Sequence, residues 1–296
     1  MLKITAYAKV NLFLEITGKL ANSYHTVDTV MQSVSVSDSI ELEFVPRIQG
    51  ISLTVNDSTV PIDDRNIAYK AAKKYIEAVD LDCGVHINLI KNIPTEAGMG
   101  GGSADGASVL VGLNRMNNNY LNDDKLTHIA STIGADVPFC IAGGTQRLSG
   151  IGTELVEKLE TPSLHLVIAK PHTGISTPEA YKRLDLLHHD FLNHSPADSG
   201  MLLYSVRNKC CSGIANYMFN RFEEACDILC PATSELIAFM KDNSHGALLS
   251  GSGAAVFAIV ESNNEANILI NKIKYKFPDY FVSEAHTVSS GCIFNN

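Results

Sequence analysis

A glycine-rich stretch carries the strongest chemical signal in the sequence. Residues 93–105 read Ile-Pro-Thr-Glu-Ala-Gly-Met-Gly-Gly-Gly-Ser-Ala-Asp, between an expected strand at 85–90 and an expected helix at 104–116. Closely spaced glycines cost conformational entropy, so they indicate a backbone that approaches another group closely. Backbone N–H groups and the positive end of the helix dipole would form an anion site there. A flexible turn is the alternative, but the helix that follows directly favours phosphate binding.

The stretch matches neither of the two commonest phosphate motifs. A Walker A loop ends in Gly-Lys-Ser/Thr, and Gly102-Ser103 lacks the lysine. The dinucleotide fingerprint G-x-G-x-x-G would need a glycine at Ser103. The sequence therefore predicts a phosphate site of another type.

Two further segments place charged or polar side chains among apolar neighbours. Lys9 and Asn11 lie in the apolar run 4–16, which reads as a strand. If the Lys9 ammonium is buried, it needs a partner. The alternative interpretation is an edge strand on which Lys9 is solvated. Asp136 follows Gly134 and precedes Val137-Pro138, where a helix N-cap is the alternative. If the two charges meet, Asp136 could take a proton from an attacking hydroxyl while Lys9 stabilises the developing alkoxide.

Two short motifs suggest ligand contacts. Tyr24-His25 follows a polar loop and suits stacking and hydrogen bonding to a planar base, although ordinary packing is the alternative. The segment Ser250-Gly251-Ser252-Gly253 interrupts an apolar strand. Glycines there indicate either a plain bulge or a close approach to a ligand.

Metal-ligand spacing is not evident in the sequence. Histidine and cysteine pairs are adjacent or lack partner ligands, namely His188-His189, Cys210-Cys211, and Cys226 with Cys230. We therefore predict no protein metal site of the zinc type.

Composition limits the class of protein. The chain has 296 residues, 45% of them hydrophobic, and a formal net charge of −9. The negative charge argues against nucleic acid or an anionic membrane as partner. Seven cysteines without a C-x-x-C pair are typical of reduced thiols in a cytoplasmic protein. The sequence shows neither an apolar run of ~18 residues nor the features of a secretory signal.

The expected elements mix strands and helices in both halves, which predicts an α+β protein of two domains, 1–160 and 161–296. Extended segments are expected at 4–16, 39–44, 85–90, 164–169 and 247–260. Helices are expected at 64–79, 104–116, 125–133, 178–184, 219–230 and 234–242. The stretch 185–212 is polar and poorly periodic.

Taken in chain order, these segments resemble the motifs of the GHMP small-molecule kinases, over nearly the whole chain. Residues 8–14, Ala-Lys-Val-Asn-Leu-Phe-Leu, are similar to the opening motif of one branch, A-K-[IVL]-N-L-F-L. The other resembling segments are the ATP motif at 93–103, Gly-Ala-Asp-Val-Pro at 134–138, a substrate-lid segment at 175–177 with Tyr181, and the third motif at 249–253.

The resemblance implies a two-domain GHMP kinase fold with the active site in the cleft between the domains. The N-terminal domain would be ribosomal-protein-S5-domain-2-like, with the ATP-phosphate loop at 93–105, and the C-terminal domain a ferredoxin-like α/β domain. The cofactors implied are ATP and Mg²⁺. The branch with this opening motif implies 4-diphosphocytidyl-2-C-methyl-D-erythritol as substrate, phosphorylated on its 2-hydroxyl for isoprenoid precursor biosynthesis.

Residue roles follow from the same resemblance. Lys9 and Asp136 would be the catalytic pair, with Asp136 as the base. The residues implied for ATP are Pro94, Gly98, Gly100, Gly101, Gly102, Ser103 and, near the adenine, Asn66. The residues implied for the cytidine substrate are Asn11, Tyr24, His25, Thr177 and Tyr181.

Two departures from the family pattern concern specificity. The family usually reads R-x-D-G-Y-H where residues 19–25 read Lys-Leu-Ala-Asn-Ser-Tyr-His, and Glu96 starts the phosphate loop. The alternatives are a GHMP kinase for homoserine or mevalonate, which needs no base platform at Tyr24-His25, and a non-catalytic nucleotide-binding relative, which needs no base. We expect small-molecule partners only, and a monomer or weak homodimer.

Overall fold

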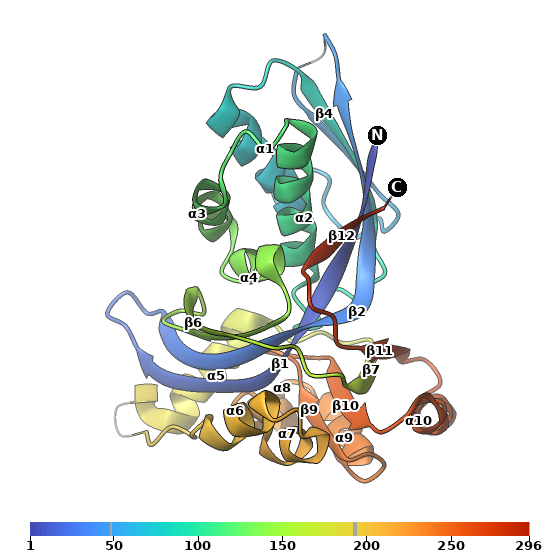
Figure 1. The fold of residues 1–296 in the computed structure, drawn as a ribbon. Helices are drawn as coiled ribbons and strands as arrows, with labels where there is room; N and C mark the ends of the chain where they lie inside the picture. Colours follow the sequence, from blue (N-terminus) through green and yellow to red (C-terminus); the bar gives the residue numbers. More distant parts are fainter. Residues whose placement is uncertain (48, 192–193, 296) are drawn as a thin grey trace.

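Two β-sheets with packed helices form the molecule, and two long strands cross from one half to the other (Figure 1). The computed structural model describes residues 1–47, 49–191 and 194–295. The first sheet has the central order β12-β1-β2-β4-β3, with β5 beside β2, β6 beside β5, and β8 beside β1. Its strands are β1 (Leu2–Lys19), β2 (His25–Val45), β3 (Ile51–Val55), β4 (Gly84–Ile90), β5 (Thr145–Ser149), β6 (Glu154–Leu159), β8 (Phe219–Asn220) and β12 (Cys292–Asn295).

Four helices pack on the upper part of this sheet: α1 (Ile67–Val79), α2 (Gly101–Met116), α3 (Asp123–Ile133) and α4 (Val137–Ala142) (Figure 1). Helix α2 lies against both α1 and the sheet. A Cβ at Gly106 would lie 2.6 Å from Ile67 Cγ2, and one at Gly112 would lie 2.4 Å from Ile4 Cδ1. These glycines let α2 approach its neighbours closely, which fixes where its N-terminus lies.

The second sheet has the order β11-β7-β10-β9 and is antiparallel throughout. Its strands are β7 (His165–Lys170), β9 (Gly246–Leu249), β10 (Val256–Val260) and β11 (Phe281–His286). The helices of this half are α5 (Thr177–His188), the short 3₁₀ helix η1 (His189–Phe191), α6 (Gly200–Arg207), α7 (Cys211–Tyr217), α8 (Glu223–Leu229), α9 (Pro231–Lys241) and α10 (Asn263–Lys276).

Both faces of the second sheet are covered, which explains its continuous apolar sequence. In β7, Leu166 and Ile168 pack with Val10 of β1, whereas Val167 and Ala169 pack in the cluster that contains Leu269 of α10. A strand buried on both faces loses the alternation of polar and apolar residues. The same reason applies to β1, where every residue from 8 to 16 is buried.

The predicted α+β class is confirmed, and most predicted elements are present. Helix α2 begins at Gly101, three residues before the predicted start, so the glycine-rich stretch forms its first turn. The predicted helix at 219–230 is instead the short strand β8 followed by α8, and the stretch 185–212 contains η1 and α6. The division into two domains at residue 160 stays a prediction. One strand from beyond that position, β12 near the C-terminus, pairs with β1 in the first sheet.

Candidate active site

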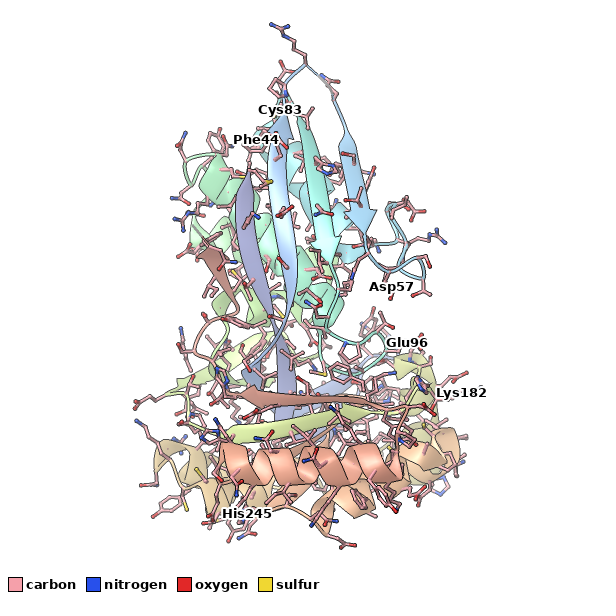
Figure 2. The ribbon with its side chains drawn as sticks, turned by 90° about the vertical axis from the view of Figure 1, so that its right-hand side faces the viewer. Phe44, Asp57, Cys83, Glu96, Lys182 and His245 are labelled. Atoms are coloured by element: carbon pink, nitrogen blue, oxygen red, sulfur yellow. The ribbon has the colours of Figure 1, made fainter. Side chains whose placement is uncertain are left out.

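The glycine-rich loop separates two neighbouring cavities. The larger, of about 760 Å³, contains Lys9, Asp136 and Tyr181 in its wall. The smaller, of about 580 Å³, contains Asn66, Pro94 and most of the loop. Gly98, Gly100 and Ser103 line both cavities. Figure 2 shows Glu96, of the smaller cavity, and Lys182, of the larger, at the junction between the halves. A molecule in each cavity would therefore meet the other at the loop.

The loop backbone requires glycine where it passes its neighbours. Gly98 and Gly100 have φ angles of 70° and 66°, in the left-handed region. A Cβ at Gly98 would fall 1.9 Å from the carbonyl oxygen of Ser250, and one at Gly100 would fall 3.0 Å from Cγ of Lys9. Because the N-cap residue Gly100 has no side chain, the first N–H groups of α2 stay available to an anion.

Lys9 is buried and faces Asp136, so the solvated-lysine alternative is wrong. Its side chain is 5% exposed, and its Nζ lies 3.4 Å from Oδ2 of Asp136 and donates to Oδ1 of Asn11 at 2.8 Å. The backbone N–H of Lys9 donates to the carbonyl of Met99 at 3.0 Å, which joins β1 to the loop. Asn11 donates in turn to Thr29 Oγ1 at 2.8 Å. The chain of bonds fixes the ammonium beside the loop.

Asp136 stands where α3 ends and α4 begins. Gly134 ends α3, and Pro138 lies in the first turn of α4, so the backbone turns sharply at the aspartate. Asp136 occupies the N-cap position of α4 but makes no side-chain capping bond. Its carboxylate, 29% exposed, turns to Lys9 and the larger cavity instead.

His25 and Tyr181 form an aromatic platform in the larger cavity. Their rings stack with centroids 4.5 Å apart at an interplanar angle of 18°. Burial and, secondarily, the charge of Asp136 raise the pKa of Tyr181 to about 12, so it stays a neutral phenol. Tyr24 also lines this cavity but is 61% exposed.

Asp185 and Lys19, which sequence reasoning missed, fix this platform. His25 Nε2 lies 2.6 Å from Oδ1 of Asp185, and Lys19 Nζ donates to its Oδ2 at 2.8 Å. Burial opposes ionisation of Asp185, but these two bonds outweigh it and lower its pKa. No local signal marked either residue, because β1 and α5 meet only in the folded chain.

The turn between β9 and β10 braces the loop rather than forming a plain bulge. Ser250 Oγ donates to the carbonyl of Gly98 at 3.0 Å, and the N–H of Ala255 donates to the carbonyl of Ala97 at 3.1 Å. Ser252 Oγ lies 2.7 Å from Oγ1 of Thr177, the first residue of α5. The turn thus joins the loop to α5, and with it to the platform.

Asn66 caps α1 in the wall of the smaller cavity. Its Oδ1 accepts from the N–H of Ala68, and its Nδ2 donates to the carbonyl of Pro61, both at 2.8 Å. Both ends of the amide are engaged, so any contact of Asn66 with a nucleotide stays a prediction.

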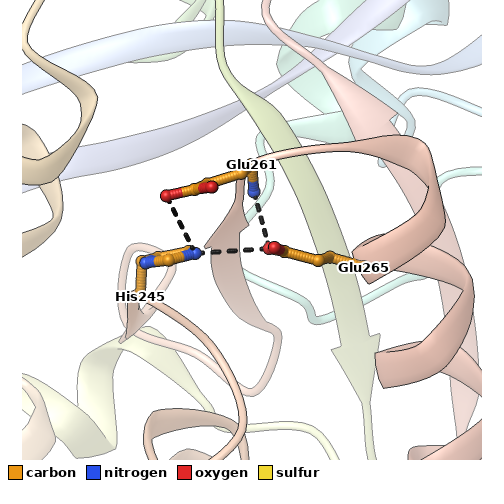
Figure 3. A group of neighbouring side chains, drawn as sticks. All are labelled: His245, Glu261 and Glu265. Atoms are coloured by element: carbon orange, nitrogen blue, oxygen red, sulfur yellow. Dashed lines mark hydrogen bonds and ion pairs between the residues drawn. The ribbon is translucent and has the colours of Figure 1, made fainter.

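A separate group of possible metal ligands lies away from these cavities. His245, Glu261 and Glu265 gather at the start of α10, with His245 Nε2 3.6 Å and 3.2 Å from the two carboxylates (Figure 3). Figure 2 places His245 at the end of the second half that is remote from the junction. The imidazole is 41% exposed, so these are ordinary surface contacts to which we assign no metal.

Comparison with known protein families identifies the class. The model described as GHMP kinases N terminal domain matches residues 66–144, and that described as GHMP kinases C terminal matches residues 202–279. Both matched ranges include residues that line the cavities, among them Asn66 and Asp136 in the first and Phe222 and Ser252 in the second. Within the described part of the chain, no helix is long and apolar enough to cross a membrane.

Sequence identity to individual proteins places the chain in one family within this class. The chain is 38% identical to 4-diphosphocytidyl-2-C-methyl-D-erythritol kinase of Clostridium beijerinckii, over 95% of this chain and 99% of that protein. It is 37% identical to the enzyme of the same name from Exiguobacterium sibiricum, over 92% and 93% of the two chains. The chain therefore belongs to the GHMP kinases, in the family of the 4-diphosphocytidyl-2-C-methyl-D-erythritol kinases.

Solved structures agree with this assignment. A crystal structure of 4-(cytidine 5'-diphospho)-2C-methyl-D-erythritol kinase superposes with a TM-score of 0.81 at 28% identity, covering 96% of this chain and 98% of that one. Homoserine kinase from Cytophaga hutchinsonii gives 0.77 at 20% identity, covering 99% and 97% of the two chains. The latter likeness concerns the fold alone.

Proposed function

We propose that this protein transfers the γ-phosphoryl group of ATP to the 2-hydroxyl of 4-diphosphocytidyl-2-C-methyl-D-erythritol, giving the 2-phosphate and ADP. The reaction belongs to the non-mevalonate route to isoprenoid precursors. The observation that carries the proposal is the pair of cavities sharing Gly98, Gly100 and Ser103, with Lys9 and Asp136 in the wall of the larger one. A kinase needs two substrates in contact at one point, and the loop is that point.

The nucleotide would occupy the smaller cavity. Its phosphates would lie on the N–H groups of the loop and of the first turn of α2, where the helix dipole favours negative charge. Pro94 and Asn66 line the same cavity and would contact the nucleoside end. Phosphoryl transfer consists largely of positioning and neutralisation of charge, which this geometry provides.

Lys9 and Asp136 would act on the acceptor hydroxyl. Asp136 would accept the hydroxyl proton or orient the hydroxyl for attack, since its carboxylate lies beside Lys9 in the wall of the larger cavity. The Lys9 ammonium would stabilise negative charge on the attacking oxygen and the transferring group. Asn11 keeps the ammonium in place.

Mg²⁺ fits the donor set at this site. In kinase sites the ion is held mainly by substrate phosphates and one or two carboxylates. The nucleotide phosphates at the loop would therefore be the main ligands of the ion, and the partly exposed carboxylate of Asp136 beside the loop would stay free to act on the acceptor hydroxyl. The ion would supply neutralisation of phosphate charge.

The cytidine end would occupy the aromatic side of the larger cavity. The buried His25 and the partly buried Tyr181 offer a stacked platform, and the exposed Tyr24 offers a further ring. Thr177 and Asn11 line the same cavity. Every one of these groups comes from one chain, so we propose a monomer or weak homodimer. The free cysteines of the described residues support a cytoplasmic location.

ADP release with Mg·ATP tests the acceptor. We expect turnover with 4-diphosphocytidyl-2-C-methyl-D-erythritol and background rates with homoserine, mevalonate or no acceptor. Turnover with homoserine or mevalonate instead would show that the acceptor is that compound and not the cytidine substrate. If no acceptor gives ADP release and the protein still binds nucleotide, the protein would be a non-catalytic relative.

A further inference from the structure

Beneath the glycine-rich loop, one lysine holds two buried aspartates. Lys91 Nζ donates to Oδ2 of Asp105 at 2.7 Å and to Oδ2 of Asp38. The three side chains are at most 8% exposed and come from β2, the segment after β4, and α2. One ammonium cannot balance two carboxylates, so the cluster carries an excess negative charge when both are ionised.

The two aspartates are not equivalent. Oδ1 of Asp38 accepts the backbone N–H groups of Asn92 and Ile93, at 2.6 and 2.8 Å, at the entry to the loop. Oδ1 of Asp105 has no hydrogen-bond partner among the described residues. Burial raises the pKa of Asp105; Lys91 opposes this effect, and the charge of Asp38 adds to it. Asp105 is therefore the carboxylate of the cluster that more readily holds a proton.

The cluster lies directly under the expected phosphate position. Lys91 and Asp105 line the smaller cavity together with the loop. A Cβ built on Gly101, the first residue of α2, would lie 3.3 Å from Lys91 Nζ. Phosphates bound at this turn would add negative charge close to Asp105 in a poorly solvated region, which further favours its neutral form.

We propose that Asp105 takes up a proton when nucleotide phosphates bind to the loop, so that the cluster beneath them becomes neutral. This inference rests on the proposed function, because it requires the loop to hold phosphates. Asp105 acts through Lys91 and the loop and is a positioning residue. Linkage requires that nucleotide binding weaken as the pH rises and the proton becomes harder to acquire.

Other groups near Asp105 do not explain such an uptake. Besides Lys91 and Asp38, the thiol of Cys140 in α4 is within electrostatic range, and burial raises its pKa so that it is already protonated. Helix α1 presents the uncharged Ile67 to this part of α2. The other charged residues of the smaller cavity, Arg65 and Glu96, are exposed, and no histidine lines it in the part of the chain that the structure describes.

Calorimetry of MgADP binding measures the uptake directly. Between about pH 7.5 and 9 the phosphates of ADP are already ionised, so buffers of low and high ionisation enthalpy report protons bound by the protein. We expect an uptake of up to about one proton per nucleotide and a Kd that weakens by at most about tenfold per pH unit. Asp105→Asn should abolish the uptake and flatten the pH dependence. Glu96→Gln, which removes the other carboxylate of the cavity, should leave the uptake as in the wild type.

Several outcomes would overturn the inference. Binding heats of the wild-type protein that do not depend on the buffer across this range would overturn it without any variant. Undiminished uptake in Asp105→Asn would do the same. MgADP binding without proton uptake would overturn this inference alone. A complete lack of MgADP binding would overturn the proposed function as well.

Discussion

The Lys9 ammonium lies 3.4 Å from the Asp136 carboxylate, while its short hydrogen bond, at 2.8 Å, goes to Asn11. The two charges are close enough to attract each other strongly. Lys9 nevertheless contacts only Oδ2 of Asp136, so the carboxylate can also contact a substrate. Asp136 keeps an exposed face in the larger cavity, so a substrate hydroxyl can approach it while the ammonium stays beside the loop. This arrangement leads to the first prediction.

Asp136→Asn should abolish turnover and leave MgADP affinity within about twofold of the wild type. The amide keeps the size of the side chain but cannot accept the proton, and general-base groups contribute ~10²–10⁴-fold to rates. Steady-state ADP release and calorimetry measure the two effects. The matched control is Asp123→Asn, an exposed aspartate in the first turn of α3. An active Asp136→Asn enzyme would remove the residue from the base role.

Tyr24→Ala should raise the KM for the cytidine substrate by roughly tenfold, since stacking of one base on an aromatic ring contributes ~1–3 kcal/mol. The KM for ATP should not change, because Tyr24 lines only the larger cavity. Tyr120→Ala, at a similarly exposed tyrosine that lines neither cavity, serves as the control. Equal loss for both substrates would show that Tyr24 has a structural role.

Gly98→Ala should weaken MgADP binding by more than about tenfold and lower the free energy of unfolding by ~1–3 kcal/mol. Its Cβ would fall 1.9 Å from the Ser250 carbonyl oxygen, so the loop or the β9–β10 turn must move. Gly50→Ala separates this clash from backbone strain, because Gly50 also has a positive φ but nothing lies within 4 Å of its Cβ. That variant should lose only about 1–2 kcal/mol of stability and bind MgADP normally. Normal binding by Gly98→Ala would contradict the assigned loop geometry.

Glu15→Gln should destabilise the protein at neutral pH by ~3–5 kcal/mol, the usual cost of breaking a buried ion pair. Burial alone would raise the pKa of Glu15, but bonds from Arg221 and from the N–H groups of Ala197 and Ile16 outweigh it and lower the pKa. A lowered folded-state pKa stabilises the protein above the unfolded-state value and loses that contribution as the pH falls through the folded value. The difference between wild type and variant, measured by urea unfolding, should therefore shrink below about pH 4.5. A difference that is constant with pH would contradict this role of Glu15.

Much of the site could be predicted from local sequence, because its parts are short contiguous motifs. The glycine stretch predicted a tight loop before a helix, and Gly98, Gly100 and the start of α2 show that loop. Family membership, fold and the class of reaction were likewise predicted from five ordered segments and are confirmed. The assigned roles of the individual site residues stay predictions.

Local sequence could not predict interactions between distant segments. Asp185 and Lys19 have no distinctive neighbours in the sequence, and they pair only because the folded chain brings α5 near the end of β1. The helix α6 was missed because its polar surroundings hide a short apolar face that buries Leu202 and Val206. Tertiary burial, not periodicity, stabilises a helix of that length.

The sequence by itself determined which chemistry is present, because glycine spacing, an apolar strand with Lys9, and the turn around Asp136 are local properties of the chain. Only the tertiary structure decided which charges meet and how each one behaves. Lys9 and Lys91 both precede the helix α2 in the sequence, yet one faces a partly exposed carboxylate and the other is enclosed by two buried ones. The physical reason is that pKa and ion-pair energy depend on burial and on neighbours from other elements, which only packing brings together.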